Sequence, residues 1–513
     1  MILLDGESLT LSQLVEIARN NTDVSLAPEG RQKVIQANQW LESILKQEAP
    51  VYGINTGFGI FADKLIQPGD IRQLSRNLIL SHSVPLGEPL PGEIVRAGML
   101  VRANALVAGH SGVRIEVVER LLEMLNKGVI PVISAQGSLG SSGDLCLLSQ
   151  MALVLTTDKN DLEEESGQAV YNHQLLSGKA AMQMAGLERT ILGAKEGLAL
   201  SNGASFCAGL SAIIIEDLEY LIKNAIAAMT ISLEALRGCS AAFDQRIHDA
   251  RRHPGQKKVA DLVNRLIDGS KLIDSSRRVQ DAYSLRCTPQ VLGPVVELLS
   301  FIKRQVEREI NAATDNPLLF ENNVSLSGGN FHGEILGMAM DYAGIAMAEM
   351  GAISERRIYR LLDSVMNDGL PPMLVDTPQS AGLNSGYMML HYTAAALVLE
   401  NQTLAHPDSV HSLPTSAGQE DHNANAWTAA THAKQILDNV RKIIAIEYLC
   451  AARALSLRMK QETGLTSGNG SFSVYKQIIN IIPMDKKGDQ WLQPMVLKLE
   501  AALREQKIIV PGW

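Results

Sequence analysis

The sequence predicts an all-α fold, and two observations carry that prediction. Aromatic residues make up only 4% of the chain although 46% of its residues are hydrophobic, and a composition rich in Ala, Leu, Ile and Met favours helices over sheet sandwiches. Residues 208–236 keep apolar positions at three- and four-residue spacing without a proline and stop at Gly238, which predicts a helix of about 40 Å. Similar patterns occupy residues 291–310, 334–363 and 430–459. Several of these segments are apolar around most of their circumference, so we expect them in a large bundle or an oligomer core.

Between the predicted helices lie loops rich in Gly, Ser, Asn and Pro, where we expect the chemistry. We divide the chain into residues 1–202, an N-terminal region, and residues 203–513, a long-helix bundle followed by a C-terminal helical region. The two are expected to form one intertwined unit. Residues 156–168 are an acidic surface excursion with no evident catalytic content. The loops themselves are residues 53–59, 137–144, 201–205, 325–330 and 411–425.

The charge and the cysteines exclude several classes of protein. The net charge is −9, and the sequence has no cluster of Lys and Arg residues that could bind the phosphates of a nucleic acid. We therefore expect no nucleic-acid partner. The five cysteines are widely spaced without a CxxC pair, which predicts core thiols of a reducing compartment. The longest charge-free run, Thr377–Leu399, contains Pro378, Gly382 and His391 and is too interrupted to span a membrane. Since the N-terminus also shows no targeting segment, we expect a soluble, cytoplasmic protein without a membrane partner.

Neither a metal nor a nucleotide is expected. The glycines of GINTGFG, at positions 53, 57 and 59, fit neither the dinucleotide-binding nor the Walker spacing, and no Lys follows them. The motifs GQEDHN and NFHGE each offer a single His, and both are also open to an interpretation as loop or capping residues.

The stretch GSLGSSGDL, residues 137–145, is the most unusual in the chain. Three glycines around the serines allow backbone angles closed to other residues, so that the Gly143 amide could fold onto the carbonyl of Ser141. Loss of water from Ser142 would then give a methylidene-imidazolone, an electrophile that no encoded side chain provides. The alternative is a Gly/Ser turn that caps a helix starting near Asp144.

Six stretches in matching order resemble the histidine and aromatic amino-acid ammonia-lyase family, and together they span about residues 50–450. GSLGSSGDL is similar to the family signature GSxGASGDL, whose Ala-Ser-Gly forms the ring autocatalytically. The other stretches are VYGINTGFG (51–59), NLILSHS (77–83), EGLALSNG (196–203), QDAYSLRCTPQ (280–290) with DNPLLF (315–320) and SGGNFHGE (327–334), and SLPTSAGQEDH (412–422).

The resemblance implies an architecture and a cofactor. It implies a long central helical bundle of the fumarase/aspartase-like superfamily, assembled as a homotetramer whose active sites are shared between subunits. It also implies that Ser141, Ser142 and Gly143 form a 4-methylideneimidazole-5-one group, without metal or nucleotide. Such a group would supply an electrophile that no encoded side chain provides, as a bound cofactor does in other enzymes.

The reaction implied is the removal of ammonia from an amino acid, which needs an electrophile for the amine and a base for a β-proton. Tyr52, in a glycine-flanked loop, matches the catalytic base of the family, and a packed loop aromatic is its alternative. Tyr283 matches a second tyrosine near the ring, which assists ring formation or proton handling. The division of labour between the two tyrosines stays open.

Further positions match residues that bind the substrate. Arg286 matches the residue that binds the substrate carboxylate, a task suited to a planar guanidinium, although a structural ion pair is the alternative. Asn202 and Gln280 match amides that bind the ring carbonyl and the polar ends of the substrate, and Phe331 matches an aromatic pocket wall. For these three, simple loop stabilisation stays open.

Two positions bear on substrate choice. Ser81-His82 and Glu420, within QED, resemble the histidine-specific branch of the family, which deaminates L-histidine to urocanate in histidine catabolism. A carboxylate with a His satisfies the two polar nitrogens of an imidazole where an apolar pocket does not. Alternatively, His82 lies outside the contact shell and Glu420 is a buried hydrogen-bonded group that serves any substrate.

Several positions depart from the family pattern, and rival functions follow from them. Ser141 replaces Ala, Ala204 replaces Thr, Gly418 replaces Asn, residues 146–150 replace APLAH, and residues 423–427 replace a VSM-containing run. A related tyrosine or phenylalanine ammonia-lyase or 2,3-aminomutase is therefore a second hypothesis. A non-catalytic helical assembly protein, in which the Ser-Ser-Gly segment stays linear, is a third.

Overall fold

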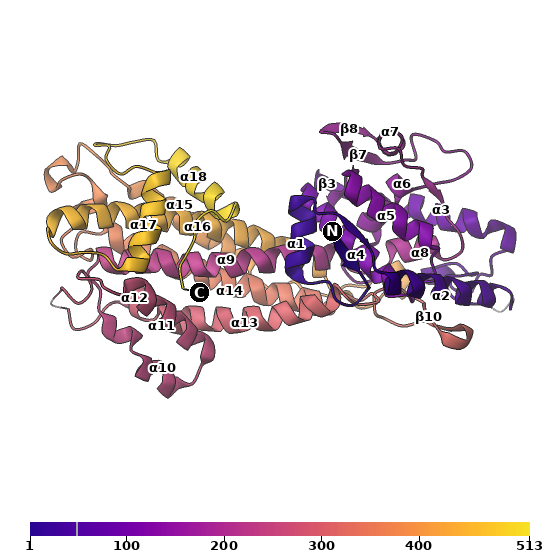
Figure 1. The fold of residues 1–513 in the computed structure, drawn as a ribbon, viewed down its shortest axis with the longest axis horizontal. Coiled ribbons are helices and arrows are strands. Elements are labelled where there is room, and N and C mark those ends of the chain that lie inside the picture. Colours follow the sequence, from indigo (N-terminus) through magenta and orange to yellow (C-terminus); the bar gives the residue numbers. More distant parts are fainter. Residues whose placement is uncertain (48–49, 277, 513) are drawn as a thin grey trace. The chain divides into compact units, whose positions relative to one another are not determined.

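The computed structural model describes residues 1–47, 50–276 and 278–512, and it confirms the predicted all-α class because most of these residues are helical (Figure 1). They form two compact units of three segments each. Unit 1 comprises Met1–Glu216, Ile302–Asp341 and Pro407–Thr431, and unit 2 comprises Asp217–Phe301, Tyr342–His406 and His432–Trp513. The boundary predicted at residue 202 stays a prediction.

Unit 1 contains most of the shorter elements. Its helices are α1 (Leu11–Asn20), α2 (Pro28–Leu45), α3 (Ile71–His82), α4 (Gly92–Val107), α5 (Ile115–Lys127), α6 (Leu145–Leu155), α7 (Gly178–Met184) and α8 (Glu196–Ser201). Its strands are β1 (Ile2–Leu4), β2 (Val24–Leu26), β3 (Leu86–Pro89), β4 (Ile130–Pro131), β5 (Ser134–Gln136), β6 (Thr156–Thr157), β7 (Gln168–Tyr171), β8 (Gln174–Ser177), β9 (Thr190–Ile191), β10 (Leu318–Phe320) and β11 (Val324–Leu326). The strands pair only in small sheets of two or three.

The four long helices expected from the apolar spacing are present. They are α9 (Ser205–Ala235), α13 (Thr288–Glu309), α14 (Glu334–Leu362) and α16 (Ala426–Gln461), each within a few residues of its predicted range. The remaining helices, α10 (Gln245–Arg251), α11 (Pro254–Ile267), α12 (Tyr283–Arg286), α15 (Met388–Leu404), α17 (Asn469–Ile481) and α18 (Gln493–Arg504), belong to unit 2. Among the described residues, no helix is long and apolar enough to cross a membrane.

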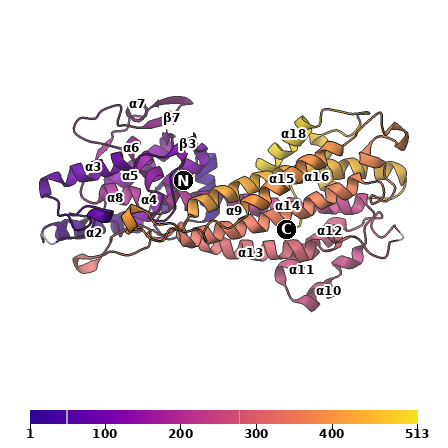
Figure 2. The same cartoon turned by 180° about the vertical axis from the view of Figure 1, so that it is seen from behind.

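A buried ion pair ties the long helices together within unit 2, where α9, α14 and α16 run alongside one another in both views (Figures 1 and 2). Arg357 of α14 makes two bonds to the Glu447 carboxylate of α16, of 2.5 and 2.7 Å, and both side chains are fully buried. Ser232 of α9 donates to the same carboxylate over 2.9 Å. Arg357 also donates to the carbonyl of Ser284, which fixes α12 to α14.

In unit 1 the helix α4 is buried along almost its whole length and carries two buried arginines. Arg96 donates to the carbonyls of Ile17, in the last turn of α1, and of Leu125, in the last turn of α5. Carbonyls in the last turn of a helix point away from the helix and carry its negative dipole end, so the guanidinium complements both helix dipoles. The second arginine, Arg102, lies beside the functional site.

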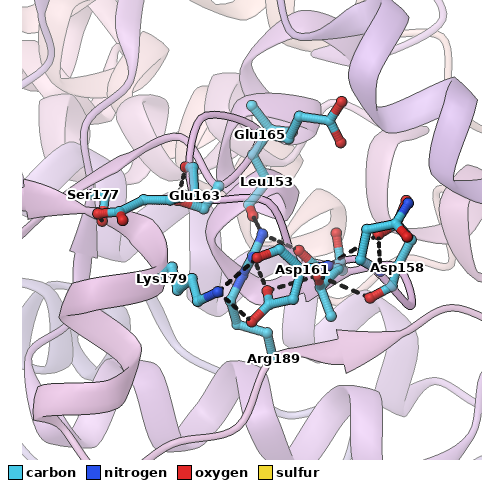
Figure 3. Close-up of polar contacts among 12 residues, drawn as sticks. Leu153, Asp158, Asp161, Glu163, Glu165, Ser177, Lys179 and Arg189 are labelled. Carbon is cyan, nitrogen blue, oxygen red and sulfur yellow. Dashed lines mark hydrogen bonds and ion pairs between the residues drawn. The ribbon is translucent and has the colours of Figure 1, made fainter.

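The acidic excursion is anchored to α3 and its neighbours by two buried guanidinium groups. Figure 3 shows Arg189 bonded to the Asp161 carboxylate over 2.5 Å and to the carbonyl of Leu153 over 2.8 Å. Arg76 of α3, which is 2% exposed, donates to the carbonyl of Glu165 over 2.8 Å. Because burial costs a guanidinium its hydration, these carbonyl and carboxylate partners hold the excursion in place. The bond from Arg76 therefore fixes the excursion to α3, the helix that ends at His82.

Candidate active site

A cavity of about 1350 Å³ lies in unit 1, lined by residues from six separate stretches of chain. They come from the loop 52–66, from the end of α3, from the region 141–145, from α8 and its C-cap, from residues 316–332 and from residues 416–422. Seven residues predicted from the sequence line this cavity: Tyr52, His82, Ser141, Ser142, Asn202, Phe331 and Glu420.

The Ser-Ser-Gly segment, residues 141–143, is packed against Gly203. Gly143 has a φ of +82°, and a Cβ built on it would lie 2.1 to 2.3 Å from backbone atoms of Gly203, so only glycine fits there. The two glycines form a parallel bridge, in which Gly203 N donates to the carbonyl of Ser142 over 3.2 Å and Asp144 N donates to the carbonyl of Gly203 over 2.9 Å. The glycines therefore hold this segment in a conformation that other residues do not adopt.

The side chain of Asp144 does not cap α6, the helix that it precedes. Its side chain makes no capping bond to α6 and instead accepts from Ser138 Oγ over 2.8 Å and from the backbone N–H groups of Phe206 and Cys207, at 2.7 and 3.0 Å. Those two N–H groups belong to the first turn of α9, where a carboxylate is favourable. Burial raises the pKa of Asp144 while these bonds oppose that shift. The alternative interpretation made this stretch only a cap for α6. The bonds of Asp144 to Ser138 and to the first turn of α9 show that it does more than that.

Asn202 brings a donor to the Ser-Ser-Gly segment. With its amide oriented to satisfy both ends, Asn202 Nδ2 donates to the carbonyl of Ser142 over 2.7 Å, and its Oδ1 accepts from Asn316 N over 3.1 Å. The Ser142 carbonyl therefore receives two hydrogen bonds, from this amide and from Gly203 N. Both polar ends of the 5% exposed Asn202 are satisfied.

His82 and Glu420 form another side of the cavity. His82 lies in the last turn of α3, and Ser81 Oγ is 3.0 Å from its Nδ1. Burial lowers the pKa of His82, while a hydrogen bond to the backbone of Leu78 and the negative charge of Glu420 oppose that shift. Glu420 accepts from Thr415 Oγ1 over 3.0 Å within a tight turn. The imidazole of His82 and the carboxyl group of Glu420 are thus electrostatically coupled in one cavity.

Tyr52 lies in the tyrosine loop, residues 51–66, which is anchored in the core by Ile54 and whose backbone–backbone hydrogen bonds among the described residues join residues of the loop itself. The Tyr52 hydroxyl accepts from Gly59 N at a long 3.5 Å. The loop closes through a bridge between Thr56 and Leu65. Yet Ile60, Phe61 and Leu65 are 55%, 59% and 55% exposed. The loop therefore places a phenol at the cavity while leaving apolar side chains uncovered.

Two histidines of the cavity were not predicted as site residues. His332 and His422 stack with ring centroids 6.0 Å apart, and His332 Nε2 lies 3.1 Å from the carbonyl oxygen of His422. Each stands in a motif whose single His left it open to an interpretation as a loop residue. Their spatial pairing joins positions 90 residues apart, and nothing in either motif indicates it. No group of three possible metal ligands occurs among the described residues.

Four predicted residues are not among those that line this cavity: Gly143, which packs against Gly203, and three residues of unit 2. Gln280, Tyr283 and Arg286 belong to unit 2, the last two in α12. Tyr283 is 70% exposed, and the Arg286 guanidinium lies 4.8 Å from the centre of its ring. One segment of unit 2 thus carries a cation, a phenol and an amide.

Comparisons with known proteins agree with the predicted resemblance. The sequence model of the family described as aromatic amino acid lyase matches residues 9–479. The histidine ammonia-lyase of Caldanaerobacter subterraneus is 45% identical over 480 residues, 93% of this chain and 91% of that protein. The histidine ammonia-lyase of Geobacillus thermodenitrificans is 44% identical over 513 residues, 99% of this chain and 98% of that protein.

Solved structures share the fold over almost the full length. A histidine ammonia-lyase from Trypanosoma cruzi superposes with a TM-score of 0.89 at 36% identity, covering 99% of this chain and 94% of that one. A tyrosine aminomutase from Streptomyces globisporus gives 0.92 at 31% identity, covering 99% and 97%. With the family model matching most of the chain, these likenesses confirm the predicted resemblance, and the chain belongs to the aromatic amino acid lyase family.

Proposed function

We propose that this chain is a histidine ammonia-lyase, which converts L-histidine to urocanate and ammonia. The observation that carries the proposal is the convergence of Ser142, Tyr52, His82 and Glu420 on one cavity. In the reaction the bond between the α-carbon and nitrogen breaks, the β-carbon loses a proton, and a carbon–carbon double bond forms. The histidine ammonia-lyases that resemble the chain at 44–45% identity support the same substrate.

The residues around Ser142 fit a methylidene-imidazolone formed from the Ser-Ser-Gly segment. Ring closure needs a residue without Cβ at 143, which the approach of Gly203 already demands, and it leaves the Ser142 carbonyl in place with its two donors. When formed, the group supplies an electrophilic carbon for the substrate amine. We assign Ser141, Ser142 and Gly143 to this group, with no metal.

The other residues bind and move protons. Tyr52 Oη takes the β-proton, since a positioned general base is what this carbon acid requires. His82 and Glu420 receive the two imidazole nitrogens, so that neither is buried unpaired. Phe331 forms a wall beside the substrate. Asn202 donates to the carbonyl of Ser142, where negative charge is stabilised by a fixed donor.

Gln280, Tyr283 and Arg286 reach the cavity from another subunit of a homotetramer. What supports this is that the cavity of unit 1 has no arginine among its lining residues in the described chain, although an amino-acid carboxylate calls for a cation. Arg286 and Tyr283 lie together on α12, with Tyr283 largely exposed. The active site is therefore shared between subunits.

Complementation between inactive variants tests this sharing. Ser142→Ala and Arg286→Ala are each expected to be inactive alone. Co-expressed, they regain histidine turnover if the arginine acts across subunits, because the intact Ser142 and Arg286 then meet in some sites. No recovery, in mixed tetramers confirmed by mass, would place both groups in one chain.

A tyrosine or phenylalanine lyase or aminomutase is the second candidate, favoured by the likeness to the tyrosine aminomutase structure. The enzyme is assayed with histidine, phenylalanine and tyrosine, following the ultraviolet absorbance of urocanate, cinnamate and coumarate and detecting β-amino acids by mass spectrometry. We expect urocanate alone. A β-amino acid or a preferred aryl substrate would overturn the histidine assignment.

A further inference from the structure

Two cations are buried behind the Ser-Ser-Gly segment without a role in the function proposed above. Arg102 of α4 is 0% exposed and Lys195, at the N-cap of α8, is 2% exposed. Charged side chains are almost never buried this completely unless they are paired. Burial lowers the pKa of both, and Asp315 opposes the shift in each case. Burial of these two cations costs hydration free energy. We therefore expect their role to lie in the groups that they hold in position.

Lys195 holds the stretch of chain that precedes Asn316. Lys195 Nζ forms an ion pair with Asp315 Oδ2, and both side chains are fully buried. The other oxygen, Asp315 Oδ1, accepts from Asn316 N over 2.6 Å. One carboxylate thus connects the buried ammonium to the backbone of residue 316.

Arg102 holds the other side of the same arrangement. It donates through Nη1 to the carbonyl of Asn202, and through Nη2 to Thr314 Oγ1 over 3.3 Å. A guanidinium with two donors in a fixed plane suits such a double contact. Arg102 therefore ties residue 202 to the stretch that Lys195 fixes through Asp315.

The chain of contacts ends at the reactive carbonyl. Asn316 N, bonded to Asp315, also lies 3.1 Å from Asn202 Oδ1, and Asn202 Nδ2 donates to the Ser142 carbonyl over 2.7 Å. Asn202 is thus fixed at its backbone by Arg102 and at its amide by Asn316. A shift of either anchor would move the donor away from the Ser142 oxygen.

We propose that Arg102, Lys195 and Asp315 are positioning residues that hold the Asn202 amide on the Ser142 carbonyl; this rests on the proposed function. In the first step Gly143 N bonds to the Ser141 carbonyl carbon; the oxygen takes the amide protons of Gly143 and Ser142 and leaves as water, and a carbon–nitrogen double bond to Ser142 N replaces the carbonyl bond. In the second, Ser142 loses its α-proton and its hydroxyl as another water. Electron density from the α-carbon passes toward the Ser142 oxygen, where a donor held in advance stabilises it.

The paired variant Lys195→Met/Asp315→Asn tests the proposal, because it removes both charges without leaving one unpaired. The control is Asp217→Asn in unit 2, whose carboxylate pairs with Arg441 at 3.2 Å and is similarly buried. Purified tetramers are measured for thermal unfolding, for the fraction of chains lighter by two waters, and for kcat and KM. We expect the paired variant to complete the ring in a minority of chains, or to lose about tenfold to hundredfold in kcat with KM within threefold. Residues that orient a functional group through hydrogen bonds, without touching the substrate, typically have effects of this size.

Thr314→Val covers the case in which the paired variant fails to fold, since it removes only one acceptor of Arg102 from a site of the same shape. Its kcat is expected to fall several-fold, with KM unchanged. Complete ring formation and kcat within twofold of wild type, in either folded variant, would overturn the proposal. Failure of the proposed function is separate, since the wild-type chain would then itself keep its full mass or leave histidine intact.

Discussion

The Ser-Ser-Gly segment and the tyrosine loop face the same cavity but are held in opposite ways. Ser141 is 4% exposed, and the neighbouring Ser142 carbonyl receives donors from Asn202 and Gly203. In the tyrosine loop, Tyr52 has one long hydrogen bond, and Phe61 is 59% exposed. The Ser-Ser-Gly segment is fixed by backbone packing and buried charge. The tyrosine loop is held at Ile54 and otherwise by hydrogen bonds within the loop, with its residues 60–65 largely exposed.

The roles proposed for the two sides account for this difference. Ring closure joins two atoms of the same backbone, so its geometry must be set before the reaction and kept by the fold. A base that meets an arriving substrate must let it in and then approach it, which loops with few anchors allow. Substitutions on the two sides should therefore fail differently, the first through the electrophile and the second through turnover.

The largest effect is expected on the fixed side. Ser142→Ala should reduce deamination to background, because no methylidene carbon forms, while thermal unfolding and the oligomer stay as in wild type. Activity assays alongside size-exclusion chromatography check both. Wild-type turnover in this variant would remove the segment from the chemistry.

On the loop side, Tyr52→Phe should keep the ring and the substrate affinity but lower kcat by ~10²–10⁴-fold, the usual contribution of a positioned acid–base group. Intact mass and steady-state kinetics measure the two. A loss of less than a few-fold would mean that the base is another residue, with Tyr283 the next to test.

Glu420→Gln tests the substrate end of the cavity. A mispaired imidazole nitrogen costs on the order of 1–3 kcal/mol, so kcat/KM for histidine should fall ~5- to 150-fold. The double variant His82→Leu/Glu420→Gln should also accept phenylalanine or tyrosine, because an apolar ring then leaves no buried polar group of the pocket unpaired. Unchanged histidine turnover in Glu420→Gln would contradict the assignment.

The same variant carries a pH signature. Glu420 partly offsets the lowering of the His82 pKa by burial, so its loss should lower that pKa further. If the neutral imidazole of His82 binds substrate, activity is lost as the pH falls through its pKa. The acid limb of the kcat/KM profile should therefore move to lower pH in Glu420→Gln, whereas a move to higher pH would contradict this use of His82.

The smallest effect concerns a departure from the family pattern. Ser141 Oγ accepts from Ala424 N over 2.8 Å in a buried place and donates to the Leu139 carbonyl. Ser141→Ala leaves that N–H unpaired, so unfolding should become easier by about 1–3 kcal/mol, while the ring still forms. Thermal unfolding at a fixed protein concentration measures this. The control Ser149→Ala, whose buried hydroxyl has no hydrogen-bond partner among the described residues, should be neutral, and equal losses in both would refute the contact.

The sequence alone predicted the four long helices and the motifs whose residues line the cavity, because apolar spacing and contiguous motifs are local signals. Tyr52, His82, Asn202 and Glu420 each stand in a motif, and the structure brings them to one cavity. The Lys195–Asp315 pair joins residues 120 positions apart, and no local pattern indicates such a contact. The sequence likewise did not predict that Arg286 belongs to unit 2. A motif indicates the chemical role of a residue but not its position in the fold.

The central claim is that this chain makes its own electrophile from residues 141–143 and uses it on histidine. Intact-protein mass spectrometry of the wild-type enzyme, on the same sample that is assayed for urocanate, tests it most directly. The account predicts a chain lighter than its sequence by two waters, together with histidine deamination. A chain of unmodified mass with full activity would contradict it.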